Sequence, residues 1–132
     1  MREILFRGKR IDNGEWVYGY YIRYGWTHQE KDYIVPLCAS DLYAKEVIPE
    51  TVGQYTGLAD KNGTKIFEED IVNFKTTAYY FKNCRIKYQS CYGRYCAIDN
   101  HGYEYPMDKT FEYEVIGNIY DNPELMRRVD NE

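Results

Sequence analysis

Short runs of alternating apolar and polar residues follow one another along most of this chain, and turn residues separate them. Alternation of this kind places every second side chain on the same face of a β-strand and is typical of a half-buried sheet. In residues 84–89 the even positions hold cysteine, isoleucine and tyrosine, while the odd positions hold arginine, lysine and glutamine. The pattern therefore predicts a protein made mainly of β-strands.

An N-terminal β-hairpin and connecting region is predicted over residues 1–46. Residues 4–9 and 16–24 have the composition of strands. Between them, Asp12-Asn13-Gly14 predicts a two-residue hairpin turn, because Asn-Gly tolerates the positive φ of a type I′ turn. The two strands are therefore expected to pair as a hairpin.

The rest of this region predicts less regular structure. Residues 33–38 predict a short strand, and Pro36 indicates an edge position because proline cannot donate to a sheet ladder. Residues 40–46 predict one or two helical turns with Ser40 as the N-cap.

A second region, residues 47–132, is predicted to be an SH3-like small β-barrel, and both regions together are small enough to pack as one compact domain. Asn62-Gly63 predicts a tight turn in an opening hairpin, and Gly117 predicts a bend or bulge. A short C-terminal helix is expected after Asn122, with Pro123 at its first position. The five strands expected to form the barrel are residues 71–75, 84–89, 95–99, 103–107 and 112–120.

Two segments carry the most specific information: VIPETVGQYTGLADKNGTKIFEEDIV at residues 47–72 and EVIGNIYDNPEL at residues 114–125. Together with REILFRGKR at residues 2–10 and GEWVYG at residues 14–19, they resemble the YopX family of bacteriophage and prophage proteins. The resemblance implies a phage or prophage gene whose product acts in the host cytoplasm. It implies no reaction and no ligand.

The chain departs from the family pattern at one position. The family usually has Glu-Gly-Asp before an Ile-Val strand, whereas this chain has Glu68-Glu69-Asp70. A glycine would suit a turn with positive φ. Glu69 is therefore expected either to adopt that disfavoured conformation or to lie in a turn of a different type.

Charge and hydropathy restrict the class of function. The formal net charge of −4 argues against a protein that binds phosphate backbones over a broad surface. No apolar run approaches the roughly 20 residues that span a bilayer, and a signal peptide is not evident, so we expect a soluble, cytoplasmic protein without a membrane partner. The candidates for a local basic patch, which are more simply interpreted as solvated strand faces, are Arg7, Lys9, Arg10, Lys82, Arg85, Lys87 and Arg94.

Metal binding is not predicted. The acidic run at residues 68–70, with Asp60 nearby in sequence, has no calcium-loop spacing and is better interpreted as turn residues beside a strand. The cysteines lack the C-x-x-C pair of most zinc sites, and we expect them to be reduced thiols in a cytoplasmic protein. The four cysteines are Cys38, Cys84, Cys91 and Cys96.

An enzyme is not predicted either. His28 and His101 are the two histidines, and neither has a recognised nucleophile motif beside it. The sequence has no glycine-rich phosphate loop of the common spacings. We therefore assign no catalytic residue, no cofactor and no metal, and a small enzyme with an unrecognised site is kept as an alternative.

Tyrosine is the strongest compositional signal. Sixteen tyrosines are more than a core of this size can bury with every hydroxyl satisfied, so some are expected at the surface. Interfaces favour tyrosine because it combines a large contact area with a hydrogen-bonding tip. The simpler interpretation is that tyrosine replaces leucine in a strand-rich chain. The residues predicted to contact a partner are Tyr79, Tyr80, Tyr92 and Tyr95.

These observations predict a non-catalytic protein-binding module that forms a homo-oligomer and binds a host or phage protein. The first alternative is a nucleic-acid-associated accessory protein. Basic and aromatic residues are interleaved in residues 82–95, an arrangement that also occurs in small barrels that bind single strands. The net charge of the chain makes this alternative the weaker one.

Overall fold

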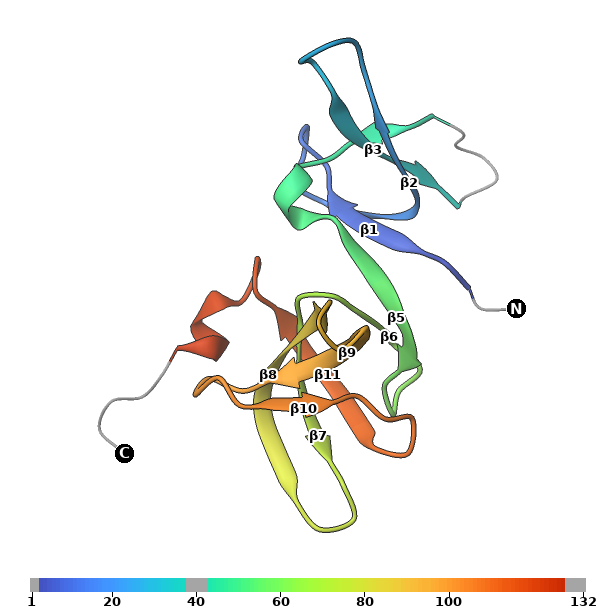
Figure 1. The fold of residues 1–132 in the computed structure, drawn as a ribbon. Helices are drawn as coiled ribbons and strands as arrows, with labels where there is room; N and C mark the ends of the chain where they lie inside the picture. The colour runs from blue at the N-terminus through green and yellow to red at the C-terminus, as the bar shows by residue number, and fades with distance from the viewer. Residues whose placement is uncertain (1–2, 38–42, 128–132) are drawn as a thin grey trace. The chain divides into compact units, whose positions relative to one another are not determined.

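The computed structural model describes residues 3–37 and 43–127, which form β-strands, connecting turns and two short 3-10 helices. The chain divides into two compact units, Met1–Tyr55 and Thr56–Glu132 (Figure 1). They divide within strand β5 (Gly53–Ala59), whereas the sequence places the boundary between residues 46 and 47. No helix among the described residues has the length and apolar character needed to cross a membrane.

The first unit is an antiparallel β-sheet. Its strands are β1 (Phe6–Lys9), β2 (Trp16–Tyr24), β3 (Lys31–Pro36), β4 (Lys45–Glu46) and the beginning of β5. They lie in the order β4-β3-β2-β1-β5, and the 3-10 helix η1 (Pro49–Thr51) leads into β5. The predicted hairpin is confirmed, because β1 pairs with β2. Its turn is longer than the predicted two-residue type I′ turn, because the last pair is Lys9 with Trp16, and Gly14 has a positive φ of 71° whereas Asn13 does not.

Close packing in this unit depends on a glycine at residue 8. Ile34 and Val47 are buried, with at most 1% of either residue exposed. A Cβ atom at Gly8 would lie 3.0 Å from the Cβ of Val47, which is tighter than most real Cβ contacts. The absence of a side chain at residue 8 therefore allows Val47 to pack directly against β1.

Two predictions for this unit are wrong. The helical turns expected at residues 40–46 are absent from the described part of that segment, because residues 45–46 pair with residues 33–34 to form β4. Residues 40–42 lie outside the described residues. Strand β3 lies between β2 and β4 and is not an edge strand. Pro36 is nevertheless tolerated in β3. The two-residue β4 pairs only with residues 33–34, so no ladder bond to β4 is needed at Pro36.

The second unit contains the larger core. Its strands after β5 are β6 (Lys65–Phe67), β7 (Asp70–Lys75), β8 (Tyr80–Gln89), β9 (Arg94–Ile98), β10 (Glu104–Pro106) and β11 (Glu112–Asn118). The last five form an antiparallel sheet in the order β10-β9-β8-β7-β11. One face of this sheet covers a cluster of buried side chains. Its members are Ile66, Val72, Phe74, Cys84, Ile86, Ala97 and Tyr113.

The five strands predicted for the barrel are present, but they do not form a closed SH3-like barrel. β10 and β11 are the two edges of the sheet and do not pair with each other among the described residues. β10 is three residues long and ends at Pro106, which has no backbone N–H to extend a ladder. The bulge predicted at Gly117 is confirmed, because the pairing of β11 with β7 shifts register between Val115 and Gly117.

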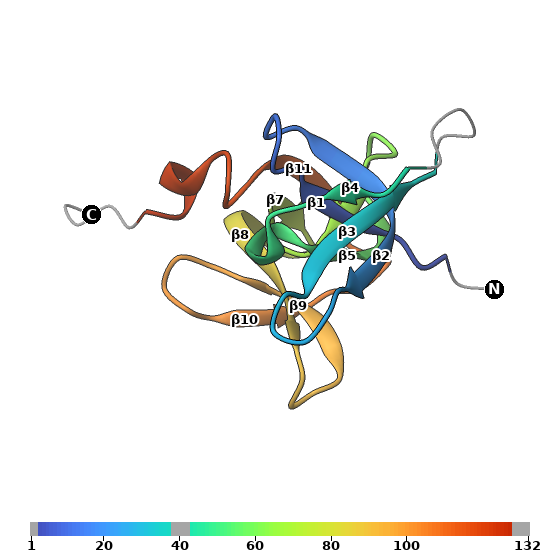
Figure 2. The ribbon, with the colours of Figure 1, turned by 90° about the horizontal axis from the view of Figure 1, so that it is seen from above.

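The C-terminal helix is shorter and of a different type than the sequence predicts. The described chain has the four-residue 3-10 helix η2 (Pro123–Met126) after β11 (Figure 2). Pro123 is at its start as predicted, but Asn122 makes no side-chain cap bond to it. The Asn122 Oδ1 atom instead accepts a hydrogen bond from the backbone N–H of Asn118, at 3.3 Å. The segment therefore makes a single tight turn against the end of β11.

Candidate functional site

The turn between β7 and β8 places two of the predicted tyrosines, Tyr79 and Tyr80, at the surface. Tyr79 is 69% exposed and Tyr80 is 56% exposed. The Thr76 hydroxyl accepts hydrogen bonds from the backbone N–H groups of Ala78 and Tyr79, at 3.2 and 3.1 Å, and the Thr76 N–H donates to the Tyr79 carbonyl at 2.8 Å. These bonds set the direction in which both tyrosines leave the turn.

Tyr79 contributes to an open pocket, which we call the aromatic pocket. Its volume is about 220 Å³. The rings of Phe81 and Tyr105 are 4.5 Å apart between centroids, and those of Phe74 and Phe81 are 4.7 Å apart. Apolar rings therefore form most of its surface. The residues that line it are Phe74, Thr76, Tyr79, Phe81, Tyr105, Pro106, Met107, Asp108 and Phe111.

Strand register explains why these rings meet. Phe74 of β7 lies directly opposite Phe81 of β8 on the core face of the sheet. β10 places Tyr105 beside Phe81. The turn before β11 places the ring centroid of Phe111 6.0 Å from that of Phe74. Phe74 is 2% exposed, whereas Phe81, Tyr105 and Phe111 are only partly buried against the core cluster. The aromatic pocket is thus the place where the core of this unit opens to solvent.

Asp108 is the charged residue among those that line the aromatic pocket. Its Oδ1 atom accepts hydrogen bonds from the backbone N–H and the hydroxyl of Thr110, both at 2.8 Å. These two bonds lower the pKa of Asp108 below its ordinary value, against a smaller opposing effect of burial. The carboxylate is therefore ionised at neutral pH, and it gives the pocket a negative rim.

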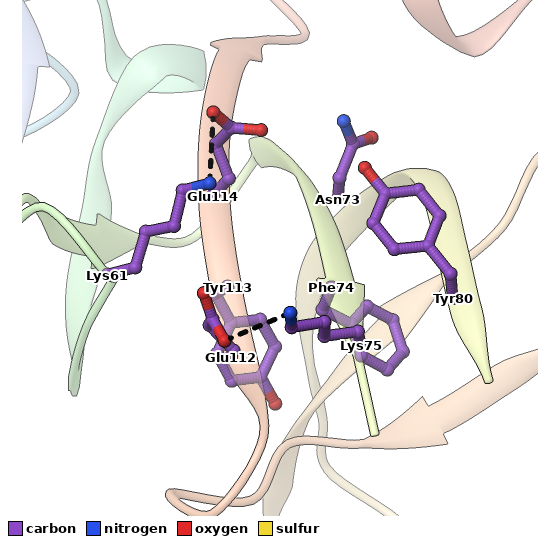
Figure 3. Close-up of a pocket in the computed structure, with 8 residues that line it drawn as sticks. All are labelled: Lys61, Asn73, Phe74, Lys75, Tyr80, Glu112, Tyr113 and Glu114. Atoms are coloured by element: carbon purple, nitrogen blue, oxygen red, sulfur yellow. Dashed lines mark ion pairs between the residues drawn. The ribbon is translucent and has the colours of Figure 1, made fainter. Parts of the chain in front are cut away.

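Tyr80 lines a second pocket of about 70 Å³ on the other face of the sheet, which we call the polar pocket. Figure 3 shows its two ion pairs: the Lys61 ammonium lies 3.7 Å from the Glu114 carboxylate, and the Lys75 ammonium lies 3.5 Å from that of Glu112. Both cations already face an anion, so the polar pocket has little net charge to offer a ligand. Its lining residues are Lys61, Asn73, Phe74, Lys75, Tyr80, Glu112, Tyr113 and Glu114.

The other two predicted tyrosines lie elsewhere in this unit. Tyr92 is in the turn between β8 and β9, is 60% exposed, and has the Arg94 guanidinium 4.7 Å from its ring centroid. Tyr95 is partly buried and packs edge-on against Tyr88, with 5.1 Å between ring centroids. The four predicted tyrosines thus do not line one common pocket, and their role in binding a partner stays a prediction.

The carboxylates considered for a cation site have separate structural roles. Asp60 accepts hydrogen bonds from the backbone N–H groups of Asn62, Thr64 and Val115, at 2.8, 2.9 and 3.0 Å. Burial by itself raises the pKa of Asp60, but these three bonds outweigh it and lower the pKa below its ordinary value. Asp70 accepts a 2.8 Å bond from the Phe67 N–H. No group of metal-ligating side chains is found in the described part of the chain.

Of the two possibilities expected for Glu69, a disfavoured backbone conformation or a turn of a different type, the structure shows the first. The φ of Glu69 is 72°, a region that favours glycine. Its N–H donates to the Ile86 carbonyl at 2.7 Å, and its carbonyl accepts from the Ile119 N–H at 3.0 Å. Its carboxylate binds the Arg85 guanidinium through two hydrogen bonds. These contacts hold the strained residue in place and also engage one of the predicted basic residues.

The candidate nucleophiles and bases do not form a catalytic arrangement in the described residues. Cys84 is buried, and burial together with the charge of Asp99 raises the pKa of its thiol to about 12. His101 is exposed in a turn that the Asp99 carboxylate organises by accepting a hydrogen bond from the His101 N–H at 2.9 Å. His28 lies in a loop of the first unit with a φ of 65°. Cys96 is buried and Cys91 exposed, both as free thiols, and Cys38 lies outside the described residues.

Sequence reasoning predicted that some of the tyrosines lie at the surface, but it did not group any of them into the two aromatic surfaces that the structure shows. The phenylalanines of the aromatic pocket were not singled out, although the pairing of residues 74 and 81 across one hairpin is a usable signal. In the first unit, alternate residues of β2 form an exposed face, which we call the β2 face. Their spacing of two along a strand is a second usable signal. The residues of the β2 face are Tyr18, Tyr20, Ile22 and Tyr24, which are 44%, 59%, 44% and 66% exposed.

The family model of the YopX protein matches residues 5–127, which is most of the chain. The chain belongs to the YopX family. This YopX chain is also similar to the crystal structure of protein EF1440 from Enterococcus faecalis, with 21% sequence identity and a TM-score of 0.52. The match covers 96% of this chain and 100% of that one, and at this identity it shows a shared fold alone. A comparison with curated proteins found no significant match.

Proposed function

We propose that this YopX protein is a non-catalytic protein-binding module, and that its aromatic pocket receives a side chain of the partner. The observation that carries the proposal is the pocket itself, in which aromatic rings next to the core stay partly exposed. Apolar surface that a fold leaves open is characteristic of interaction sites. Aromatic pockets that take one anchoring side chain commonly dominate the binding energy of an interface.

The size of the aromatic pocket favours a side chain over a metabolite. Sites for small-molecule ligands are usually clefts of roughly 300–1,000 Å³. A volume of about 220 Å³ is below that range and fits one large side chain. The partner would then be a protein, of the phage or of its host, in keeping with the setting that the family implies, the cytoplasm of an infected bacterium.

The residues considered for catalysis support the non-catalytic part of the proposal. The Asp60 carboxylate holds backbone N–H groups, and Glu69 binds Arg85. The thiol of Cys84 is neutral at physiological pH because its pKa is about 12, and a neutral thiol is a poor nucleophile. The two carboxylates thus have structural roles that account for their positions, and the Cys84 thiol is buried in the core cluster.

Self-association is part of the same proposal, and the β2 face supports it. Monomeric proteins rarely leave a contiguous row of aromatic and aliphatic side chains on one face of a sheet exposed. We expect light scattering to give a mass well above the 15.8 kDa of one chain, and Tyr20→Lys to return it to that of one chain. A monomeric wild-type protein at micromolar concentration would contradict this part of the proposal.

Nucleic-acid association is the second candidate, and two contacts weaken it. Arg85 is bound by Glu69, and the Arg94 guanidinium lies over the Tyr92 ring. Two of the four basic residues in the interleaved segment thus already have partners within the protein. Binding that depends on phosphate contacts would weaken steeply as salt increases.

The experiment that tests the proposed function is a capture from host lysate with two matched variants. Tyr79→Ala removes a wall of the aromatic pocket, and Tyr80→Ala removes a neighbouring tyrosine of similar exposure that lines the polar pocket. The lysate is treated with nuclease. We expect a stoichiometric protein bound by the wild-type protein and by Tyr80→Ala but not by Tyr79→Ala.

The captured protein would then be purified and its affinity measured. We expect Tyr79→Ala to weaken binding at least about tenfold, the size of effect that interface anchors show. Equal binding by the two variants would exclude the aromatic pocket as the site. Recovery that is lost on nuclease treatment would favour the nucleic-acid candidate. Thermal unfolding of both variants controls for loss of folding.

A further inference from the structure

We propose that the aromatic pocket receives a basic side chain, arginine or lysine, of a peptide segment in the partner. This inference rests on the proposed function and adds the chemistry of the occupant. It is argued from the rings that surround the pocket, from the charge at its rim, and from its shape.

The rings provide the first argument. A cation within about 6 Å of the centroid of an aromatic ring is attracted to its face. Tyr79 and Phe81 have centroids 6.3 Å apart, and Phe81 and Tyr105 have centroids 4.5 Å apart. A positive group that enters the pocket is therefore within reach of more than one ring at once. A guanidinium can also stack flat on a ring, which an ammonium cannot do.

The charge provides the second argument. Asp108 lines the pocket, and the Thr110 bonds keep its carboxylate ionised at neutral pH. A cation bound among the rings would have a counter-ion at the rim, whereas a carboxylate of the partner would be repelled. Lys109 is the cation next to Asp108 in sequence, and it is exposed and does not line the pocket. The chain as a whole has a net charge of −4, which also favours a basic partner.

The shape provides the third argument. Arginine and lysine carry their charge at the end of an aliphatic stem that packs well on apolar surface. Pro106 and Met107 of the lining offer such surface next to the rings. A neutral aliphatic side chain could occupy the same space and pack on the rings, but it would gain neither charge attraction from Asp108 nor cation–π attraction from the ring faces. The geometry thus fits a long cationic side chain better than an apolar one of equal length.

The test compares two small probes that differ in charge, N-acetyl-arginine amide and N-acetyl-norleucine amide. Both are titrated into full-length protein with ¹³C-labelled methionine methyl groups. Met107 lines the pocket and reports binding, and Met126, in η2, serves as an internal reference. We expect the arginine probe to shift the Met107 signal and to bind about two- to fivefold more tightly than the norleucine probe.

Two variants locate the source of that preference. Asp108→Asn keeps an oxygen acceptor for Thr110 but removes the charge, and we expect it to reduce the preference for the arginine probe. Tyr79→Leu keeps apolar surface at an exposed position but removes a ring, and it should reduce the preference as well. Tyr80→Leu, which changes the polar pocket, should leave it unchanged.

The outcomes separate this inference from the proposed function. Equal affinity for the two probes at Met107 would overturn the basic occupant and would leave a pocket that binds side chains. A Met107 signal that neither probe shifts at millimolar concentration would also overturn the inference. The proposed function would still be decided by the Tyr79→Ala and Tyr80→Ala captures, in which the whole partner is present.

Discussion

The aromatic pocket and the polar pocket lie on the two faces of one sheet, and neighbouring residues, Tyr79 and Tyr80, contribute to them. The two tyrosines are similarly exposed, but their surroundings differ. Around Tyr80, each lysine of the polar pocket forms an ion pair with a glutamate, so the charges of this pocket are already paired within the protein. Around Tyr79, aromatic rings are left partly open beside one ionised carboxylate. Exposure alone therefore does not distinguish the two tyrosines, whereas the chemistry around each of them does.

The largest expected effect comes from Phe74, because it contributes to both pockets. It is 2% exposed and contacts the rings of Phe81, Phe111 and Tyr113. We expect Phe74→Ala to reduce the free energy of unfolding by about 3–5 kcal/mol, measured by urea denaturation. A loss below about 1 kcal/mol would show that Phe74 is not closely packed against these rings.

The next effect concerns Asp60, which holds the turn that carries Lys61 of the polar pocket. Its carboxylate binds the turn through Asn62 and Thr64 and binds β11 through Val115. We expect Asp60→Ala to cost about 1–3 kcal/mol, because buried N–H groups lose their acceptor. The folded Asp60→Ala variant should bind the partner with unchanged affinity. This result would show that the polar pocket does not contribute to binding at the aromatic pocket.

Asp60 also predicts a pH dependence. Because the folded pKa of Asp60 lies below the ordinary value that the unfolded chain keeps, its contribution to stability is fully present above that ordinary value and is lost as the pH falls through the folded pKa. The unfolding free energy of the wild-type protein should therefore fall toward that of Asp60→Asn in acid, and the difference between them should be largest near neutral pH. A difference that grows as the pH falls would contradict the assigned direction of the pKa.

The smallest effect is expected in the polar pocket itself. Lys75 and Glu112 are about half exposed, and exposed ion pairs contribute roughly 0–1 kcal/mol. We expect Lys75→Met to change the free energy of unfolding by less than about 0.5 kcal/mol at physiological salt, and to leave partner affinity within about twofold. A clear loss of affinity would mean that the partner also covers the polar face.

Local features of the fold were predictable from the sequence. The hairpin around Asn13-Gly14 forms, although its turn is longer than expected, Gly117 forms the expected bulge, and Glu69 adopts one of the two conformations expected for its turn. Each of these depends on residues close together in the chain. The alternation in residues 84–89 likewise gives the expected strand, with Cys84 and Ile86 in the core.

Features that depend on distant residues were not predictable. The prediction of a closed barrel was wrong. Closure requires pairing between β10 and β11, and the three-residue β10 does not pair with β11 within the described chain. Residues 45–46 were predicted as helix but form a strand that pairs with β3. This pairing depends on residues 33–34, so the local helix propensity of residues 45–46 does not predict it. The aromatic pocket joins Phe81, Tyr105 and Phe111 from three segments, so it is visible only once the register is known.

The most direct test of the account measures the affinity of one purified partner for three forms of the protein by calorimetry. The forms are wild-type, Tyr79→Ala and Tyr80→Ala. The account predicts that Tyr79→Ala binds at least about tenfold more weakly than wild-type, while Tyr80→Ala stays within about twofold. Equal losses in the two variants, or a larger loss in Tyr80→Ala, would contradict the assignment of binding to the aromatic pocket.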